Sequence, residues 1–307
     1  MQYTFQYHSN GSFLLTGEYL VSEGSQAIVL PLKKGQTLVI KPIKEDLLIW
    51  EDIYNEETLF TAVFSTDQID IIESTDGEKA SFVGDVLKTA MDHLASLSSL
   101  PGYYIKAIHN YPIHLDPGTR PALIACVAEW FNINPFRLSR AIMKDAGYGI
   151  AGARSSKPIL YQLVDTSPDY KHIALNPSYT GNIYFVYAGD HEGLSGEREQ
   201  IEHTGNLPHV IPKIREINKN IIQSGSLEDF EHALLEYEQF LSGLLNEKSV
   251  QERLFDDFPG VIKPLVTHNS KFLLVTWKGS MSELREFFAG YNLQTLFQWD
   301  ELIKNEK

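Results

Sequence analysis

Short apolar segments separated by polar and glycine-containing stretches fill the first third of the chain, and they constrain its fold more than any other feature. Examples are Phe13–Leu15, Ala27–Leu30 and Thr37–Ile40. Runs of this length bounded by Gly, Ser, Glu and Lys are typical of β-strands. Asp46–Ile53 and Glu57–Phe64 predict a further hairpin. The chain therefore begins with a β-rich region.

Helical spacing enters after this region and then alternates with strands. Phe82–Leu97 carries apolar residues at helical spacing, and Tyr103–Ile108 returns to strand alternation. The later pattern predicts helices at Pro121–Phe131, Phe136–Met143, Pro212–Gln223, Leu227–Leu245, Val250–Phe255, Met281–Phe288 and Gln298–Ile303, and strands at Pro158–Val164, Asn182–Tyr187 and Phe272–Trp277. We expect an α+β fold of two domains, residues 1–175 and 176–307, with the boundary in the region 165–185.

Size, charge and cysteine content exclude several classes of protein. A chain of 307 residues can bury a large core. Its 26 basic and 40 acidic residues give a net charge of −14, which argues against nucleic acid or an anionic membrane as a partner. The lone Cys126 excludes an internal disulfide and fits a reducing compartment, so we expect a cytoplasmic protein. No apolar run approaches the length that spans a bilayer.

Two strings resemble motifs of a known family. Residues 11–20 read Gly-Ser-Phe-Leu-Leu-Thr-Gly-Glu-Tyr-Leu and resemble the opening motif of the GHMP small-molecule kinases, a superfamily that includes mevalonate, phosphomevalonate, homoserine and galactose kinases. Residues 147–151 read Gly-Tyr-Gly-Ile-Ala and are similar to the Gly-Tyr-Asp-Ile-Ala string of its bacterial GYDIA-type subgroup. Later strings follow in the family's order at residues 236–238, 258–263 and 272–276. The resemblance covers most of the chain.

This resemblance implies a GHMP-kinase-like fold with an N-terminal β-rich α+β domain, a C-terminal ferredoxin-like domain and a nucleotide and substrate cleft between them. Such kinases need a Gly/Ser loop at a helix N-terminus for the phosphates, a carboxylate near the acceptor hydroxyl, a lysine that offsets charge and a C-terminal glycine-rich loop. The positions that match this pattern form a candidate remnant ligand cleft: Ser12, Glu18, Gly118, Thr119, Arg120, Tyr148, Gly149 and Lys263.

The phosphate loop departs from the family pattern. In place of a Gly-Leu-Gly-Ser-Ser type loop, residues 115–123 read Leu-Asp-Pro-Gly-Thr-Arg-Pro-Ala-Leu. The two prolines lack N–H donors, and Asp116 adds a negative charge where phosphate should bind. We therefore expect the phosphate cradle to be lost. Arg120 remains a candidate anion partner, and Asp116 is equally a candidate to neutralise it.

The expected catalytic side chains are also replaced, so we assign no catalytic residue. Gly149 stands where the family has the aspartate that faces the acceptor hydroxyl, and we expect this glycine to supply backbone freedom in a tight turn. Asp145 is the nearest replacement carboxylate, but we expect it to be exposed at a helix end. Ser12 replaces the family lysine and cannot offset phosphate charge. Glu18 has two interpretations, a ligand contact or a structural cap of a neighbouring loop.

The C-terminal region offers no glycine loop, and the chain offers no metal site. Residues 264–271 contain no glycine, although His268 and Lys271 remain candidate anion contacts. His109 and His114 match no zinc-binding arrangement. Cys126 lies on the apolar face of a predicted helix, where we expect it to serve the core rather than catalysis.

Three functional hypotheses follow. The first is a kinase homologue that has lost phosphoryl transfer and acts as a binding or regulatory pseudoenzyme, without a cofactor, toward a small anionic ligand or a protein partner. The second is an active small-molecule kinase of the mevalonate-pathway type that binds Mg-ATP in a rebuilt site with Arg120, Lys263 and Glu18. The third is a structural partner protein without a small-molecule ligand. A homo-oligomer is compatible with each. The replaced motifs favour the first hypothesis.

Overall fold

The backbone forms two compact units in the computed structural model, which describes residues 4–93, 99–116, 118–189, 191, 207–266 and 271–306. Unit 1 comprises residues 1–11 and 34–154, and unit 2 comprises residues 12–33 and 155–307. Two long strands, β1 (Phe5–Thr16) and β2 (Ala27–Pro42), contribute residues to both units. The expected domain boundary between residues 175 and 176 stays a prediction.

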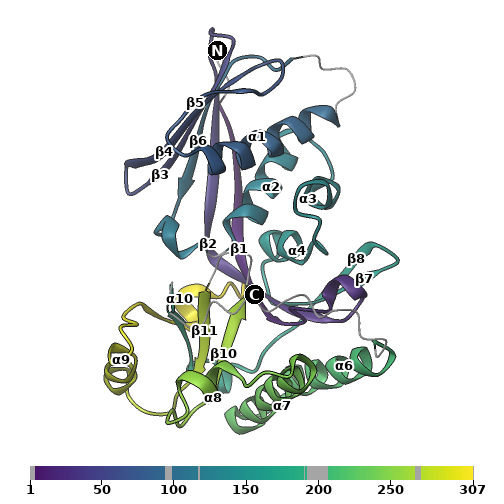
Figure 1. Ribbon diagram of the computed structural model, residues 1–307, viewed down its shortest axis with the longest axis vertical. Helices are drawn as coiled ribbons and strands as arrows, with labels where there is room; N and C mark the ends of the chain where they lie inside the picture. Colours follow the sequence, from purple (N-terminus) through teal and green to yellow (C-terminus); the bar gives the residue numbers. More distant parts are fainter. Residues whose placement is uncertain are drawn as a thin grey trace. The chain divides into compact units, whose positions relative to one another are not determined.

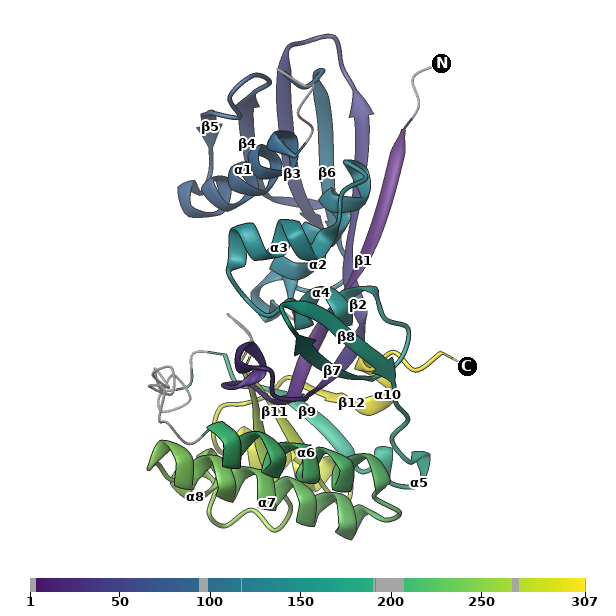
Figure 2. The ribbon, with the colours of Figure 1, turned by 90° about the vertical axis from the view of Figure 1, so that its right-hand side faces the viewer.

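Unit 1 consists of a sheet with helices packed on one face (Figures 1 and 2). Its strand order is β5-β4-β3-β6-β2, and β3 pairs antiparallel with β4 and parallel with β6. The strands are β3 (Leu47–Tyr54), β4 (Glu57–Ser65), β5 (Ile71–Ser74) and β6 (Tyr103–His109), and the helices are α1 (Gly77–Asp92), α2 (Thr119–Trp130), α3 (Pro135–Met143) and α4 (Tyr148–Arg154). Apolar side chains from both layers, among them Trp50, Leu87 and Ile124, form the core of this unit.

Local sequence signals explain where these helices begin. Asp76 caps α1 by accepting a hydrogen bond from the backbone N–H of Lys79 at 3.1 Å. Asn134 caps α3 in the same way, and Pro135 occupies the first helical position, where its missing N–H costs nothing. In α2, Pro121 also lies in the first turn. The prolines of this region therefore start helices rather than interrupt them.

Unit 2 contains a four-stranded antiparallel sheet with the order β10-β11-β9-β12. Its strands are β9 (Ile183–Tyr187), β10 (Ile262–Val266), β11 (Lys271–Thr276) and β12 (Leu296–Gln298). Its helices are α5 (Pro177–Thr180), α6 (Leu207–Gln223), α7 (Leu227–Leu245), α8 (Val250–Leu254), α9 (Met281–Ala289) and α10 (Trp299–Leu302). Helices α6 to α8 connect β9 to β10, and α9 connects β11 to β12, which is the β-α-β-β-α-β order of ferredoxin-like folds. The predicted α+β class is confirmed.

A second sheet segment belongs to unit 2. The start of β2 pairs with β7 (Ile159–Val164), which pairs in turn with β8 (Ser167–His172) as an antiparallel hairpin. Helices α6 and α7 pack side by side in the same unit (Figure 2). Among the residues that the structure describes, no helix is both long and apolar enough to cross a bilayer.

The predicted elements agree with the structure best where the apolar period is long. Helix α7 has the bounds predicted for it, whereas α1 begins five residues before Phe82 and the end predicted for it falls in 94–98, outside the described residues. Helix α6 begins before Pro212 and contains this proline. Strands β8 and β10 and helix α4 were not predicted. Helix α4 and strand β10 are the elements that carry Gly149 and Lys263.

Candidate functional site

The predicted cleft residues are divided between the two units. Unit 1 contains Gly118, Thr119, Arg120, Tyr148 and Gly149, whereas unit 2 contains Ser12, Glu18 and Lys263. Within unit 1, the first turn of α2 and the start of α4 come together, and within unit 2 Glu18 and Lys263 come together.

The N-terminus of α2 already holds an anion of the chain itself. The backbone N–H of Thr119 donates to Oδ1 of Asp116 at 3.0 Å, and Gly118 between them has a φ of +84°. The positive end of the helix dipole favours a carboxylate at this place. A phosphate would use the same donor, so the N–H of Thr119 is occupied while Asp116 holds it. Pro117, the first of the two loop prolines, lies outside the described residues.

Thr119 also ties this loop to the sheet. Its hydroxyl is 2.6 Å from the hydroxyl of Tyr111, and its carbonyl accepts a hydrogen bond from Nε2 of Gln36 at 2.9 Å. Burial raises the pKa of Tyr111 well above its ordinary value, so this hydroxyl stays neutral. The contacts of Thr119 are therefore internal to unit 1.

A buried charge cluster lies beside Tyr111, and sequence reasoning missed it. Nδ1 of His109 is 3.4 Å from the Tyr111 hydroxyl, and Nε2 of His109 is 3.5 Å from Oδ2 of Asp52, which also pairs with Lys79. Nε1–H of Trp50 donates to Asp52 at 2.7 Å. Burial opposes ionisation of Asp52, but the neighbouring His109 ring and the charge of Lys79 outweigh it and lower the pKa of this carboxyl.

The strand pattern contained a signal for this cluster. Leu48, Trp50 and Asp52 alternate along β3 and are all buried, so they share the inward face of the sheet. A carboxylate at an inward position requires a buried partner. Lys79 and His109 supply it from α1 and β6.

Arg120 lies at the surface of unit 1. Its guanidinium is 3.7 Å from the carboxylate of Glu78, not paired with Asp116, and it lies 4.9 Å from the ring centroid of Phe82. The side chain of Glu78 is 91% exposed, so this ion pair contributes little stability. Stacking on Phe82 therefore positions the guanidinium of Arg120, while Glu78 neutralises its charge only weakly.

Gly149 lies inside helix α4 and is buried, so the predicted tight turn is wrong. The glycine with a positive φ, +78°, is Gly147, two residues earlier. A Cβ added to Gly149 would lie 2.7 Å from Cγ and 3.0 Å from Cβ of Pro121. Packing favours glycine here because α4 lies directly against the proline ring in the first turn of α2.

Asp145 organises the turn before α4. Its Oδ1 accepts hydrogen bonds from the Ser139 hydroxyl at 3.2 Å and from the Gly147 backbone N–H at 3.1 Å. The carboxylate is half-buried, so the expected exposed position is wrong. Tyr148, also half-buried, begins α4 directly after this turn.

Lys263 is the centre of a second buried charge cluster, in unit 2. Its Nζ is 2.8 Å from Oε1 of Glu18 and 2.8 Å from Oε1 of Glu238. The hydroxyl of Tyr237 donates to Oε2 of Glu18 at 2.6 Å and accepts from the backbone N–H of Gly17 at 2.6 Å. Burial disfavours the ammonium, but the two glutamates outweigh this cost and raise the pKa of Lys263. We name Glu18, Tyr237, Glu238 and Lys263 the lysine cluster.

The lysine cluster joins the segment after β1 to helix α7 and strand β10. Both carboxylates face one ammonium, so Lys263 has no positive charge to spare for a phosphate. This geometry favours the structural interpretation of Glu18. Ser12, in β1, is likewise buried, with 4% of its surface exposed. The signal for Glu238 was its spacing, since it falls on the buried stripe of α7 with Leu234 and Leu241.

Metal and thiol chemistry find no support in the described part of the chain. No group of three or more His, Cys, Asp or Glu side chains there is arranged to hold a metal ion. Burial raises the pKa of the Cys126 thiol to about 12, so this side chain is an inert part of the core. His268 and the side chain of Lys271 lie outside the described residues.

Solved structures of small-molecule kinases have the same fold as this chain. The mevalonate kinase of Methanococcus jannaschii aligns with a TM-score of 0.68 at 14% sequence identity, covering 100% of this chain and 99% of that chain. The galactokinase of Lactococcus lactis, solved with galactose, aligns with a TM-score of 0.69 at 12% identity, covering 98% and 94%. The phosphomevalonate kinase of Streptococcus pneumoniae aligns with a TM-score of 0.63 at 14% identity, covering 97% and 99%. No family model and no curated protein matches the sequence. The chain has the fold of the GHMP kinases.

Proposed function

We propose that this chain is a GHMP-kinase homologue of the GYDIA-type bacterial subgroup that has lost phosphoryl transfer and acts as a binding or regulatory pseudoenzyme. The observation that carries this proposal is the 3.0 Å hydrogen bond from the Thr119 N–H to Asp116. Phosphate binding at a helix N-terminus depends on backbone donors and on the absence of competing negative charge. Here a carboxylate of the chain takes that position.

The contact between Gly149 and Pro121 supports the loss of phosphoryl transfer as well, because it concerns the position where the family has the carboxylate that faces the acceptor hydroxyl. A carboxylate at position 149 would have to displace the proline ring, because a change of ring pucker moves Cγ of Pro121 but leaves its Cβ in place. Without that carboxylate, an acceptor hydroxyl has no base or positioning group from α4. The glycine at position 149 and the proline at position 121 both depart from the kinase pattern, and they pack against each other. No single substitution restores both positions.

The lysine cluster also supports the loss of phosphoryl transfer, because its lysine is not available to offset the charge of a phosphate. Lys263 would have to leave two glutamates to approach a phosphate, and breaking a buried ion pair costs about 3–5 kcal/mol. This cost would weaken the binding of a nucleotide by the same amount. This arrangement of Lys263 argues against its use in binding Mg-ATP.

A specific observation favours the alternative of an active kinase with a rebuilt site. Arg120 has a weak, exposed partner in Glu78, so its guanidinium is available to an anion at low cost. In the alternative, Arg120 holds a phosphate of Mg-ATP and the acceptor is a small-molecule alcohol. In the first proposal, the same residue holds a small anionic ligand. A protein partner and a homo-oligomer remain part of the proposal in either case.

A phosphoryl-transfer assay decides between the two. The full chain is incubated with Mg-ATP labelled at the γ-phosphate and with mevalonate or galactose as acceptor, and labelled product is separated by thin-layer chromatography. We expect no labelled product above the protein-free reaction. Turnover that Arg120→Ala abolishes, and that the matched control Arg137→Ala on the exposed face of α3 leaves intact, would establish the active kinase instead.

A further inference from the structure

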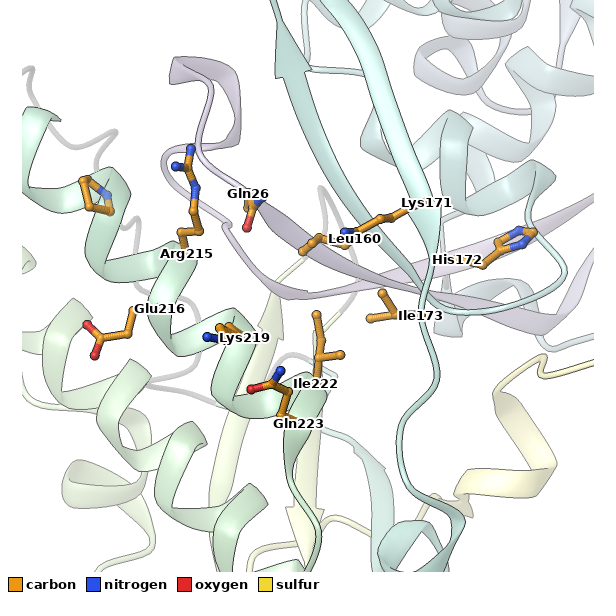
Figure 3. Close-up of a pocket in the computed structure, with 11 residues that line it drawn as sticks. Gln26, Leu160, Lys171, His172, Ile173, Arg215, Glu216, Lys219, Ile222 and Gln223 are labelled. Carbon is orange, nitrogen blue, oxygen red and sulfur yellow. The ribbon is translucent and has the colours of Figure 1, made fainter.

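A pocket with a volume of about 760 Å³ lies within unit 2, between helix α6 and the β7–β8 hairpin (Figure 3). None of the residues predicted for the ligand cleft lines it. Its volume falls in the range of sites that bind small organic molecules. The pocket is therefore large enough for a ligand and separate in composition from the site considered above.

Three cationic side chains line this pocket. Arg215 and Lys219 lie four residues apart on one face of α6, and Lys171 extends from β8 on the other side (Figure 3). Within the described part of the chain, the side chains of these three residues make no ion pair or hydrogen bond, and all three residues are exposed. In a protein with a net charge of −14, three cations without a carboxylate partner form a local positive site.

The carboxylate that lines the pocket does not neutralise this charge. Glu216 is 3.3 Å from Lys213, which lies outside the pocket lining, and its carboxylate points away from the hairpin (Figure 3). Glu216 is therefore paired with Lys213 and with none of the three cations of the pocket.

Apolar side chains form the rest of the surface that a ligand would meet. Leu160 in β7, Ile173 after β8 and Ile222 in α6 line the pocket together with the cations. Ile173 is buried, whereas Leu160 and Ile222 are half-buried and keep accessible apolar surface. A ligand that contacts both kinds of side chain needs a charged end and an apolar body.

We propose that this pocket binds a small amphiphilic phosphate monoester. Arg215, Lys219 and Lys171 hold the phosphate, and Leu160, Ile173 and Ile222 contact the apolar body. The fork of the Arg215 guanidinium matches two phosphate oxygens, and three cations suit a dianion better than a carboxylate. The ligand is a free molecule rather than a lipid headgroup, because a chain with a net charge of −14 is repelled by an anionic bilayer. This proposal does not depend on the loss of phosphoryl transfer.

Calorimetric titration of the full chain with hexyl phosphate, hexanol and inorganic phosphate tests the proposal. We expect saturable binding of hexyl phosphate, and binding of the other two probes weaker by roughly tenfold or more, since each lacks one half of the recognition. Added NaCl should weaken hexyl phosphate binding because the phosphate contacts are partly exposed to solvent.

Variants assign the binding to this pocket. Arg215→Ala combined with Lys219→Ala should weaken hexyl phosphate binding by more than about tenfold. Arg285→Ala, which removes an exposed arginine from α9 that does not line the pocket, should leave it unchanged. Ile222→Ser should reduce the preference for hexyl phosphate over inorganic phosphate. Circular dichroism confirms that each variant is folded, and the salt dependence of the unmodified chain tests the charge contacts without any variant.

Four results would overturn the proposal: no saturable binding of hexyl phosphate, equal binding of inorganic phosphate, no effect of the double variant, or no effect of salt. A fifth is sedimentation of the chain with phosphatidic acid vesicles in preference to binding of free hexyl phosphate. That result would identify a membrane lipid as the source of the phosphate and contradict the assignment to a free molecule.

Discussion

Gly149 and Pro121 are packed so closely that a Cβ on Gly149 would lie 2.7 Å from Cγ of the proline. One position belongs to the string that resembles the family's Gly-Tyr-Asp-Ile-Ala motif, and the other belongs to the loop that replaces the family's phosphate loop. The two departures from the kinase pattern therefore share one contact. An aspartate at position 149 would therefore meet the ring of Pro121.

This contact predicts that Gly149→Ala destabilises the chain. Overpacking against the rigid ring should lower the free energy of unfolding by about 1–3 kcal/mol. Pro121→Ala should restore at least half of this loss in the double variant, and urea denaturation measures both. Gly243→Ala is the matched control, because a Cβ on this helical glycine meets no atom within 4 Å. Equal losses in the single and double variants would show that the contact does not set the cost.

Asp116→Asn should make the start of α2 more receptive to anions. Asparagine keeps an acceptor for the Thr119 N–H, so we expect a stability loss below about 1 kcal/mol, while the affinity for inorganic phosphate should rise several-fold. Asp76→Asn is the control, since it removes a carboxylate from the start of another helix, where Asp76 is the N-cap of α1 and accepts from the Lys79 N–H at 3.1 Å. Phosphate titrations followed by NMR compare the variants. Identical affinities in the unmodified chain and in Asp116→Asn would remove the role assigned to the carboxylate.

Lys263→Met should be among the most destabilising substitutions of a lysine in this chain. It leaves the buried carboxylates of Glu18 and Glu238 without a counter-charge, at a cost of about 3–5 kcal/mol. The triple variant with Glu18→Gln and Glu238→Gln should recover most of that loss. Lys278→Met, which breaks an exposed pair with Glu228, should have little effect. A Lys263→Met protein as stable as the Lys278→Met control would contradict the structural role of the cluster.

The lowered pKa of Asp52 predicts a specific pH dependence of stability. The folded chain holds the carboxylate ionised, so its stabilising contribution is fully present above the unfolded value of 3.8 and is lost as the pH falls through the lower folded pKa. Asp52→Asn should therefore be destabilised at pH 7, and the difference from the unmodified chain should shrink only below about pH 4. Asp46→Asn, an exposed carboxylate in the same unit, is the control. A difference that already vanishes at pH 5 to 6 would assign the effect to another group.

The sequence predicted the elements whose periodicity is long and whose ends carry caps. Helix α7 follows Ser226, whose side chain accepts a hydrogen bond from the Asp229 N–H at 3.1 Å, and its apolar stripe continues to Leu245. Strand β10 was missed because Lys263 and Pro264 interrupt its apolar run. Its pairing with β11 shows how a lysine enters a sheet interior when two carboxylates meet it there.

The sequence shows which motif positions are replaced, but it does not show which contacts explain the replacements. The sequence showed glycine at 149, whereas the reason is a tertiary contact with a residue 28 positions earlier. In the same way, the sequence showed Asp116 near Arg120, whereas the structure pairs Asp116 with a backbone donor and Arg120 with Glu78. Contacts between distant segments decide such cases, and no local pattern encodes them.

Calorimetric titration of the full chain with Mg-ATP tests the central claim most directly. Because Asp116 occupies a donor at the start of α2 and Lys263 is neutralised by two glutamates, we expect no saturable binding, with any Kd weaker than about 1 mM. Micromolar binding, which corresponds to about −8 kcal/mol, would contradict the account and show that a phosphate site has been rebuilt.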